Sequence, residues 1–129
     1  NESSNNNSKP VLLCGDFNSD PSSAVYHGIT TGKSSNVFDE KTKPIIRTPK
    51  IFTDSPYKSC YKTILKREPK YTTYTVDFKE VLDYIFVNKA VRVQSVLEEV
   101  NKKFFDKYES FPNKEYPSDH ILLAADVKI

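Results

Sequence analysis

The chain has 129 residues, of which 37% are hydrophobic and 28% are charged, and its formal net charge is +2. This composition is ordinary for one soluble globular domain or part of one. The small charge is too weak to indicate broad electrostatic capture of nucleic acid, so any such binding must come from a specific site. No apolar run approaches the roughly 18 residues that a membrane-spanning helix needs, and no secretory signal opens the chain.

The chain contains no methionine and begins at Asn1, so we expect it to be a segment of a longer protein. Residues 1–9 are almost purely polar and are predicted to form a flexible lead, with the domain proper at residues 10–129. The two cysteines, Cys14 and Cys60, have neither metal-ligand spacing nor disulfide density. We therefore expect reduced thiols in the core and an intracellular setting.

The most informative stretch is PVLLCGDFNSDP at residues 10–21. Its apolar run leads into polar residues, which predicts a buried strand over residues 10–17 with polar side chains at its carboxyl end. Because alternate side chains of a strand share a face, Asp16 and Asn18 are expected about 7 Å apart on one edge. A carboxylate and an amide suit a phosphate and a hard divalent cation. The structural alternative is a strand-to-helix turn in which Asp16 caps the helix.

Two helices and a loop are predicted next. A short helix is expected at residues 21–31, where His27 is interpreted as a solvated or capping imidazole. Residues 33–52 read as a loop with a brief strand near residues 44–46. A second helix signal begins at residue 53. The apolar face of this second helix would consist of Tyr57, Tyr61, Ile64 and Leu65.

The second half of the chain alternates between strand and helix patterns. Residues 71–78 have the composition of a strand edge or an ordered loop, and residues 81–87 predict a second buried strand. Within that strand Asp83 is anomalous, because an unpaired carboxylate in an apolar run is costly and needs a partner. A third strand is expected at residues 90–96 and a terminal strand at residues 121–129. Between them lies an amphipathic helix with the apolar positions Val96, Val100, Phe104 and Tyr108.

Asp119 and His120 stand immediately before the terminal strand. This position places a carboxylate and an imidazole at the lip of a sheet, where rigid strands can hold catalytic groups. Asp83 is the natural partner to orient His120, by fixing its tautomer or stabilising the imidazolium. We therefore predict a hydrogen bond between the Asp83 and His120 side chains.

With GDFN, LDYIF and SDH in this order, the chain resembles the C-terminal half of an endonuclease/exonuclease/phosphatase superfamily domain, from about residue 10 to residue 129. Its closer likeness is to the poly(A) deadenylases of the carbon catabolite repressor protein 4 type. The fold implied is α/β (α+β), as part of a four-layer α/β/β/α sandwich with mixed sheets. The segments that carry this closer likeness are GDFNS, KSCY, EP, YTTYT and DFKEVLDYIF, at residues 15–19, 58–61, 68–69, 71–75 and 77–86.

The resemblance also implies roles for individual residues. Asp16 would position or activate the attacking water, Asn18 would bind phosphate and a second metal, and Asp83 would orient His120. Asp119 resembles the family's contributor to the first metal site, and His120 the group that binds the scissile phosphate. The implied catalytic set is Asp16, Asn18, Asp83 and His120, and the implied metal ligands are Asp16, Asn18, Asp119 and His120.

Phe78 matches the family's aromatic residue that stacks on the terminal adenine. It would complete a substrate-binding set with Asn18 and His120. Such a stacking contact contributes about 1–3 kcal/mol per base. The alternative for Phe78 is ordinary packing in the core.

The complete protein is accordingly expected to be a 3′–5′ exoribonuclease of mRNA decay that removes poly(A) from the RNA 3′ end and releases 5′-AMP. It would use a two-ion site holding Mg²⁺, or Mn²⁺, in the cytoplasm or also the nucleus, with no membrane association. The main glutamate ligand of the family lies upstream, so the segment alone is expected to be inactive. Its sheet faces at residues 82–87 and 121–129 would be exposed unless the N-terminal half or a second chain covers them. The alternatives are a phosphatase or phosphodiesterase acting on a small adenine nucleotide, and a non-catalytic interaction module.

Overall fold

The computed structural model of the chain describes residues 8–33 and 56–129. Most of the expected lead, the expected loop with its brief strand, and the expected start of the second helix at residue 53 lie outside the described residues. Among the described helices, none is long and apolar enough to cross a membrane.

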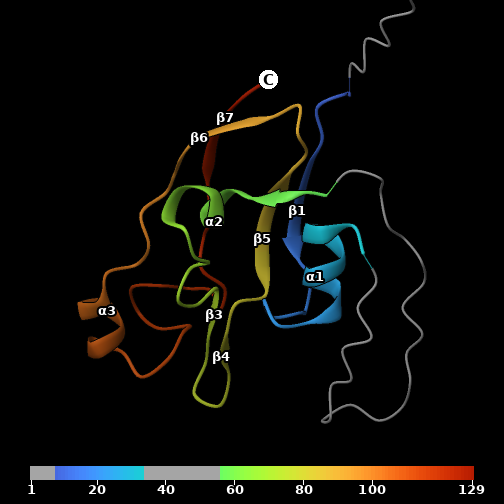
Figure 1. The fold of residues 1–129 in the computed structure, drawn as a ribbon. Helices are drawn as coiled ribbons and strands as arrows, with labels where there is room; N and C mark the ends of the chain where they lie inside the picture. The colour runs from blue at the N-terminus through green and yellow to red at the C-terminus, as the bar shows by residue number, and fades with distance from the viewer. Residues whose placement is uncertain (1–7, 34–55) are drawn as a thin grey trace, which may run out of the picture.

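The central sheet has three strands in the order β1-β5-β2, and both pairings are antiparallel. Its long pair is β1 (Leu12–Asp16) and β5 (Asp83–Val87), and β2 (Lys58–Ser59) adds a short third strand. The register of β1 and β5 sets Asp16 directly opposite Asp83. The ladder is closed at its far end by Asn88, whose backbone N–H donates to Val11 and whose side chain accepts from the same residue. Figure 1 shows this pair at the centre of the molecule.

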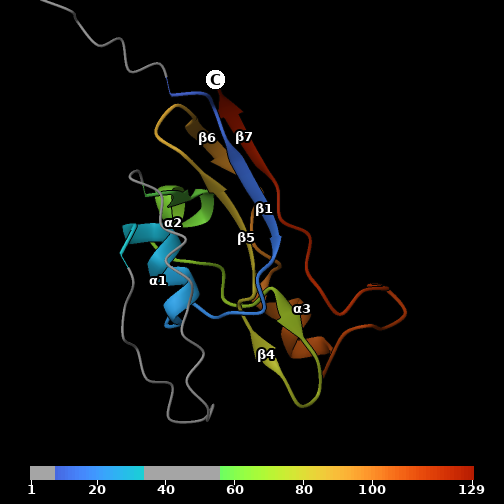
Figure 2. The same ribbon diagram turned by 90° about the vertical axis from the view of Figure 1, so that its right-hand side faces the viewer.

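The two faces of the β1–β5 pair have different roles, because side chains alternate along each strand and antiparallel partners share a face. One face continues into an aromatic cluster in which Phe17 packs edge-on against Tyr84 and Phe86, with ring centroids 5.8 and 5.3 Å away. Tyr26 of α1 (Ala24–Thr31) covers this cluster. The opposite face carries the two facing carboxylates. Figure 2 shows α1 and α2 on one side of the pair and β7 on the other.

Two helices begin at capping serines rather than at the positions that the sequence pattern indicates. In α1 the Ser23 side chain accepts from the Tyr26 N–H, and Gly32 ends the helix in the left-handed conformation with φ 69°. The helix predicted at residues 21–31 is thus confirmed with a start three residues later. Ser59 caps α2 (Cys60–Leu65) in the same way, because the preceding residues are extended to pair with β5.

The second predicted helix was therefore placed too early. Tyr57 lies before α2 and packs against the aromatic cluster that Tyr26 covers, whereas Tyr61 is buried within α2. His27, on the other hand, is exposed on α1, as the solvated interpretation requires.

A second antiparallel pair, β6 (Arg92–Val96) with β7 (Ala125–Lys128), packs against the central sheet through an apolar cluster. The predicted third and terminal strands are confirmed, although β7 is shorter than residues 121–129. The expected alternation holds from Ile121, which is buried, to Val127, but it is wrong for Ile129, which is 76% exposed at the end of the chain. The buried residues of the cluster are Cys60, Val87 and Val91.

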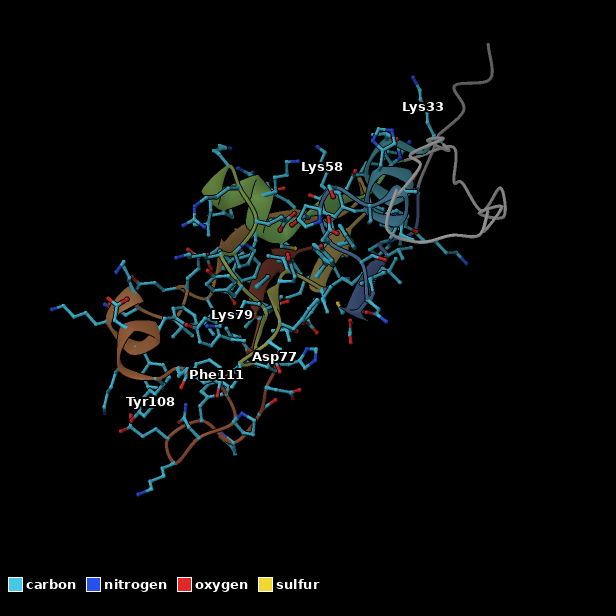
Figure 3. The ribbon with its side chains drawn as sticks, turned by 90° about the horizontal axis from the view of Figure 1, so that it is seen from below. Lys33, Lys58, Asp77, Lys79, Tyr108 and Phe111 are labelled. Atoms are coloured by element: carbon cyan, nitrogen blue, oxygen red, sulfur yellow. The ribbon has the colours of Figure 1, made fainter. Side chains whose placement is uncertain are left out.

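The remaining elements form a third cluster at the opposite end from β6 and β7 (Figure 1). The β3 (Thr73–Tyr74) and β4 (Lys79–Glu80) hairpin packs beside α3 (Lys102–Lys107). This helix is shorter than predicted, because Val96 belongs to β6 and only Phe104 of the four expected apolar positions lies within α3. Phe111, labelled in Figure 3 with Tyr108, is 2% exposed. The cluster's buried residues are Tyr74, Phe111 and Ile121.

The α/β class is confirmed, but several expectations about sheets and burial are wrong. Every strand pairing among the described residues is antiparallel, so the expected mixed sheets are absent from this part of the chain. All five residues of β1, including Cys14, are exposed rather than buried, because no described segment covers them. Conversely, the predicted burial of the second strand is confirmed in β5, because α1, α2 and β6 pack around Phe86 and Val87, which are 0% and 1% exposed. The expected exposure of its apolar face is therefore wrong.

Candidate functional site

The side chains of Asp83 and His120 form a hydrogen-bonded pair, as predicted from the sequence. Nδ1 of His120 lies 2.9 Å from Oδ2 of Asp83. Asp83 opens β5, and His120 is held by an isolated antiparallel bridge to Thr73. Both side chains are partly exposed, at 19% for Asp83 and 35% for His120. The imidazole is therefore fixed at one nitrogen and open to solvent over part of its surface.

Asp16 completes a cluster with this pair. It ends β1 opposite Asp83, and one potential ligand atom from each of Asp16, Asp83 and His120 lies within 4.8 Å of the others. The hydrogen bond to Asp83 raises the pKa of His120, burial opposes this increase, and the charges of Asp83, Asp119 and Asp16 reinforce it. The local field therefore favours the imidazolium form of His120.

Asn18 does not continue the strand as expected. The strand ends at Asp16, whose Oδ1 accepts the Asn18 backbone N–H at 2.7 Å, and Asn18 adopts a left-handed φ of 47°. An aspartate side chain that closes its own turn in this way is common where a strand gives way to a loop. The alternative role of Asp16 as a helix cap is wrong, because Ser23 caps α1. The roles of Asn18 in phosphate and metal binding stay predictions.

Asp119 lies next to His120 but outside the three-residue cluster. Its side chain is exposed, and its backbone carbonyl accepts the Tyr74 N–H at 3.1 Å. Its charge reaches His120, as the raised pKa of the imidazole indicates. The expected contribution of Asp119 to a metal site stays a prediction.

Two threonines that sequence reasoning left without a role contact the pair directly. Thr73 Oγ1 lies 3.3 Å from His120 Nδ1. Thr72 is fully buried, and its Oγ1 accepts the backbone N–H groups of Leu82 and Asp83 at 2.8 and 3.0 Å. Their only signal in the sequence is a pair of hydroxyl residues inside an aromatic stretch, which is also typical of an ordinary strand edge.

Phe78 lies at the tip of the β3–β4 hairpin and is 46% exposed. The alternative that Phe78 packs in the core is therefore wrong for the part of the chain that the structure describes. The adjoining Asp77 and Lys79 are labelled on the hairpin in Figure 3, and the Lys79 ammonium lies 4.3 Å from the centre of the Tyr74 ring. An exposed aromatic ring is available for stacking on a base, and the stacking role stays a prediction.

The chemistry of the cluster fits a hard divalent cation. Carboxylate oxygens are the preferred ligands of Mg²⁺ and Mn²⁺, whereas an imidazole is a better ligand for zinc and other late transition metals. Asp16, Asp83 and His120 could supply at most part of the coordination shell, because Mg²⁺ takes about six ligands in near-octahedral geometry. Among the described residues, these three are the only such group of carboxylate, thiol and imidazole donors.

Comparisons with known proteins identify the family of this chain. A family model described as "Endonuclease/Exonuclease/phosphatase family" matches residues 1–120. The chain is 39% identical over 121 residues to a protein of Aspergillus oryzae named "CCR4-Not complex 3'-5'-exoribonuclease subunit Ccr4", covering 91% of the chain and 16% of that protein. Proteins of the same name from Aspergillus terreus and Coccidioides immitis are 37% and 35% identical, and each match covers 93% of the chain. The chain spans 18% and 16% of the length of those two relatives.

Proposed function

This chain belongs to the endonuclease/exonuclease/phosphatase family, and from that premise we propose that the whole protein is a divalent-metal-dependent 3′–5′ exoribonuclease acting on poly(A). The product would be 5′-AMP and the setting cytoplasmic mRNA decay. The observation that carries the proposal is the meeting of Asp16, Asp83 and His120 at one end of the β1–β5 pair. The names of the fungal relatives support the choice of RNA as substrate and of the 3′ end as the starting point.

The three side chains have complementary chemistry for hydrolysis of a phosphodiester. The exposed Asp16 carboxylate can accept a proton from an attacking water or orient it. Asp83 holds Nδ1 of His120, which leaves Nε2 as the nitrogen that can donate to a phosphoryl oxygen. The raised pKa of His120 favours the cationic ring, and a cation stabilises the negative charge that develops on the phosphate.

Asp16 would hold the magnesium or manganese ion together with ligands from elsewhere in the whole protein, whereas the protonated His120, oriented by Asp83, would bind the phosphate. When bound, such an ion polarises the phosphoryl oxygen and makes hydroxide available near neutral pH. Because Asp16 fills only part of the coordination shell, we expect the 129-residue chain to be inactive by itself. Asn18 and Asp119 are the neighbouring oxygen donors that the proposal adds to this set.

The test is a shortening assay on 5′-labelled oligo(A) with Mg²⁺, using the 129-residue chain and the whole protein in parallel. We expect the whole protein to produce a ladder of shortened RNA and AMP, and the chain alone to leave the RNA intact. Asp16→Asn in the whole protein should reduce the rate by roughly 100-fold or more, the usual size of a lost acid–base contribution. His27→Asn, an exposed substitution on α1, is the matched control and should retain full activity.

Other outcomes would contradict the proposal in distinguishable ways. Release of phosphate or mononucleotide only from soluble adenine nucleotides would indicate a phosphatase or phosphodiesterase. No hydrolysis of either substrate by a folded, metal-supplied whole protein would indicate a non-catalytic module. Robust Mg²⁺-dependent shortening by the 129-residue chain would show that the described cluster suffices without further ligands.

A further inference from the structure

Thr72 occupies an unusual position between the two halves of the Asp83–His120 pair. Its side chain is 0% exposed, and its hydroxyl oxygen accepts two backbone N–H groups, from Leu82 at 2.8 Å and from Asp83 at 3.0 Å. Leu82 immediately precedes β5, and Asp83 is its first residue. A single buried hydroxyl therefore takes the place of a strand partner for two successive amides.

The backbone of Thr72 makes contacts on both sides. Its carbonyl accepts the N–H of Ile121 at 2.7 Å, and its own N–H donates to Glu80 at 2.9 Å. Ile121 directly follows His120, and His120 forms a β-bridge with Thr73, the residue after Thr72. Thr72 is thus bonded to Asp83 through its side chain and to the His120 segment through its main chain.

We propose that Thr72 is a positioning residue whose hydroxyl fixes the start of β5 and thereby holds the Asp83 carboxylate against the His120 imidazole. This inference deepens the proposed function, on which its catalytic meaning rests. The pair itself, however, can be observed in the protein without any nuclease activity. The two ideas can therefore fail separately.

The physical reason is the short reach of an aspartate side chain. Its carboxylate lies only two rotatable bonds from the backbone, so the place of the oxygens follows the place of the main chain. A displacement of about 1 Å at Asp83 stretches the 2.9 Å contact with His120 beyond hydrogen-bonding distance. Without the hydroxyl, the Leu82 and Asp83 amides lose their acceptor in a buried place and must move to find another.

The test reads the protonated nitrogen of the ring by long-range ¹H–¹⁵N NMR of the full chain, at a pH about two units above the ordinary histidine pKa. The chain has two histidines, so the exposed His27 serves as an internal reference. In the wild type we expect His120 to carry its proton on Nδ1, facing Asp83. Thr72→Val, which keeps the shape and removes the hydroxyl, should shift most of the His120 population to the form protonated on Nε2.

Two further variants separate the hydroxyl from the rest of the side chain. Thr72→Ser keeps the acceptor, loses the methyl group, and should retain the wild-type His120 signals. Thr63→Val is the matched control, because the Thr63 hydroxyl also makes a hydrogen bond, to the Ser59 carbonyl at 2.7 Å, on α2 and away from the pair. It should leave the His120 signals unchanged.

The proposal would be overturned if a folded Thr72→Val chain gave the same His120 signals as the wild type. It would also be overturned if the Ser and Val variants lost the form protonated on Nδ1 to the same extent. Amide hydrogen exchange in the wild type tests the role of the Thr72 hydroxyl even if the Val variant does not fold. The Leu82 and Asp83 amides should be protected to the same degree as the Ile121 amide, which the Thr72 carbonyl holds. Exchange of the Leu82 and Asp83 amides at the rate of exposed loop amides would refute the role of the hydroxyl.

Discussion

At the scale of single residues, the charge state of His120 is the property that matters most for the site. The hydrogen bond that His120 donates to Asp83 raises the pKa of the imidazole, and the charges of Asp119 and Asp16 act in the same direction. Partial exposure of the ring means that water screens part of these charges. The pair therefore favours the cationic form of His120.

This bias predicts a pH dependence with a definite sign. The folded pKa of His120 lies above its ordinary value of 6.5, so the stability gained from the charged pair is complete below pH 6.5 and is lost as pH rises through the folded pKa. In Asp83→Asn the NMR titration midpoint of the His120 ring should fall, because the largest cause of the shift is removed. His27 provides the internal reference in both spectra. An unchanged His120 midpoint in the variant would show that the pair does not set its charge.

At the scale of elements, the β3–β4 hairpin presents Phe78 on a closed turn. Thr75 and Phe78 are joined by backbone and side-chain hydrogen bonds, with the Thr75 N–H donating to the Phe78 carbonyl at 2.8 Å and the Phe78 N–H donating to Thr75 Oγ1 at 3.1 Å. The base of the hairpin is anchored by Tyr74, which packs into the third cluster. An exposed aromatic ring on an anchored turn is a favourable platform for a nucleic-acid base.

Phe78→Ala in the whole protein should therefore lower the preference for poly(A) over poly(U) and poly(C). Loss of one base-stacking contact, about 1–3 kcal/mol, corresponds to a decrease of roughly 5- to 150-fold for poly(A), and the ratio falls by a smaller factor because pyrimidines also stack, though more weakly. The melting temperature should change little, because the ring is already 46% exposed. Val76→Ala is the matched control, since Val76 is 60% exposed on the same hairpin. Unchanged degradation ratios for the three homopolymers would contradict the stacking role.

At the scale of the whole molecule, β1 is the least protected part of the central sheet. It is an edge strand of the described sheet, and its apolar side chains Leu12 and Leu13 are 45% and 39% exposed. Such a strand combines apolar surface with a free row of backbone hydrogen-bonding groups, which favours pairing with another chain. The site residue Asp16 ends this same strand, so whatever covers β1 also approaches the site.

The purified chain is accordingly expected to self-associate as its concentration rises. Leu12→Lys should shift the distribution toward monomer, because a charged residue on an exposed edge opposes strand pairing. Val25→Lys is the control, since Val25 is 40% exposed on α1, away from this edge. Sedimentation velocity at several concentrations gives the measurement. A wild-type chain that remains monomeric at all concentrations would contradict self-association through β1. An equal shift toward monomer by the two substitutions would contradict it as well.

Much of the local structure could be predicted because it depends on near neighbours in the chain. The alternation at residues 121–127 predicted which side chains turn inward, and Gly32 predicted the end of α1. An aspartate inside LDYIF predicted that a partner exists and that His120 fills this role. The start of α2 could not be predicted, because pairing of Lys58–Ser59 with β5 overrides the helical periodicity around Tyr57.

The sequence by itself determined the order of the chemical groups, their placement at strand ends and the partnership of Asp83 with His120. Only the tertiary structure decided that Asp16 meets that pair, since the contact depends on the antiparallel register that sets Asp16 opposite Asp83. It also decided that Thr72 supports β5 and that β1 is exposed, because hydrogen bonds and burial between distant segments follow from packing, which no local pattern encodes.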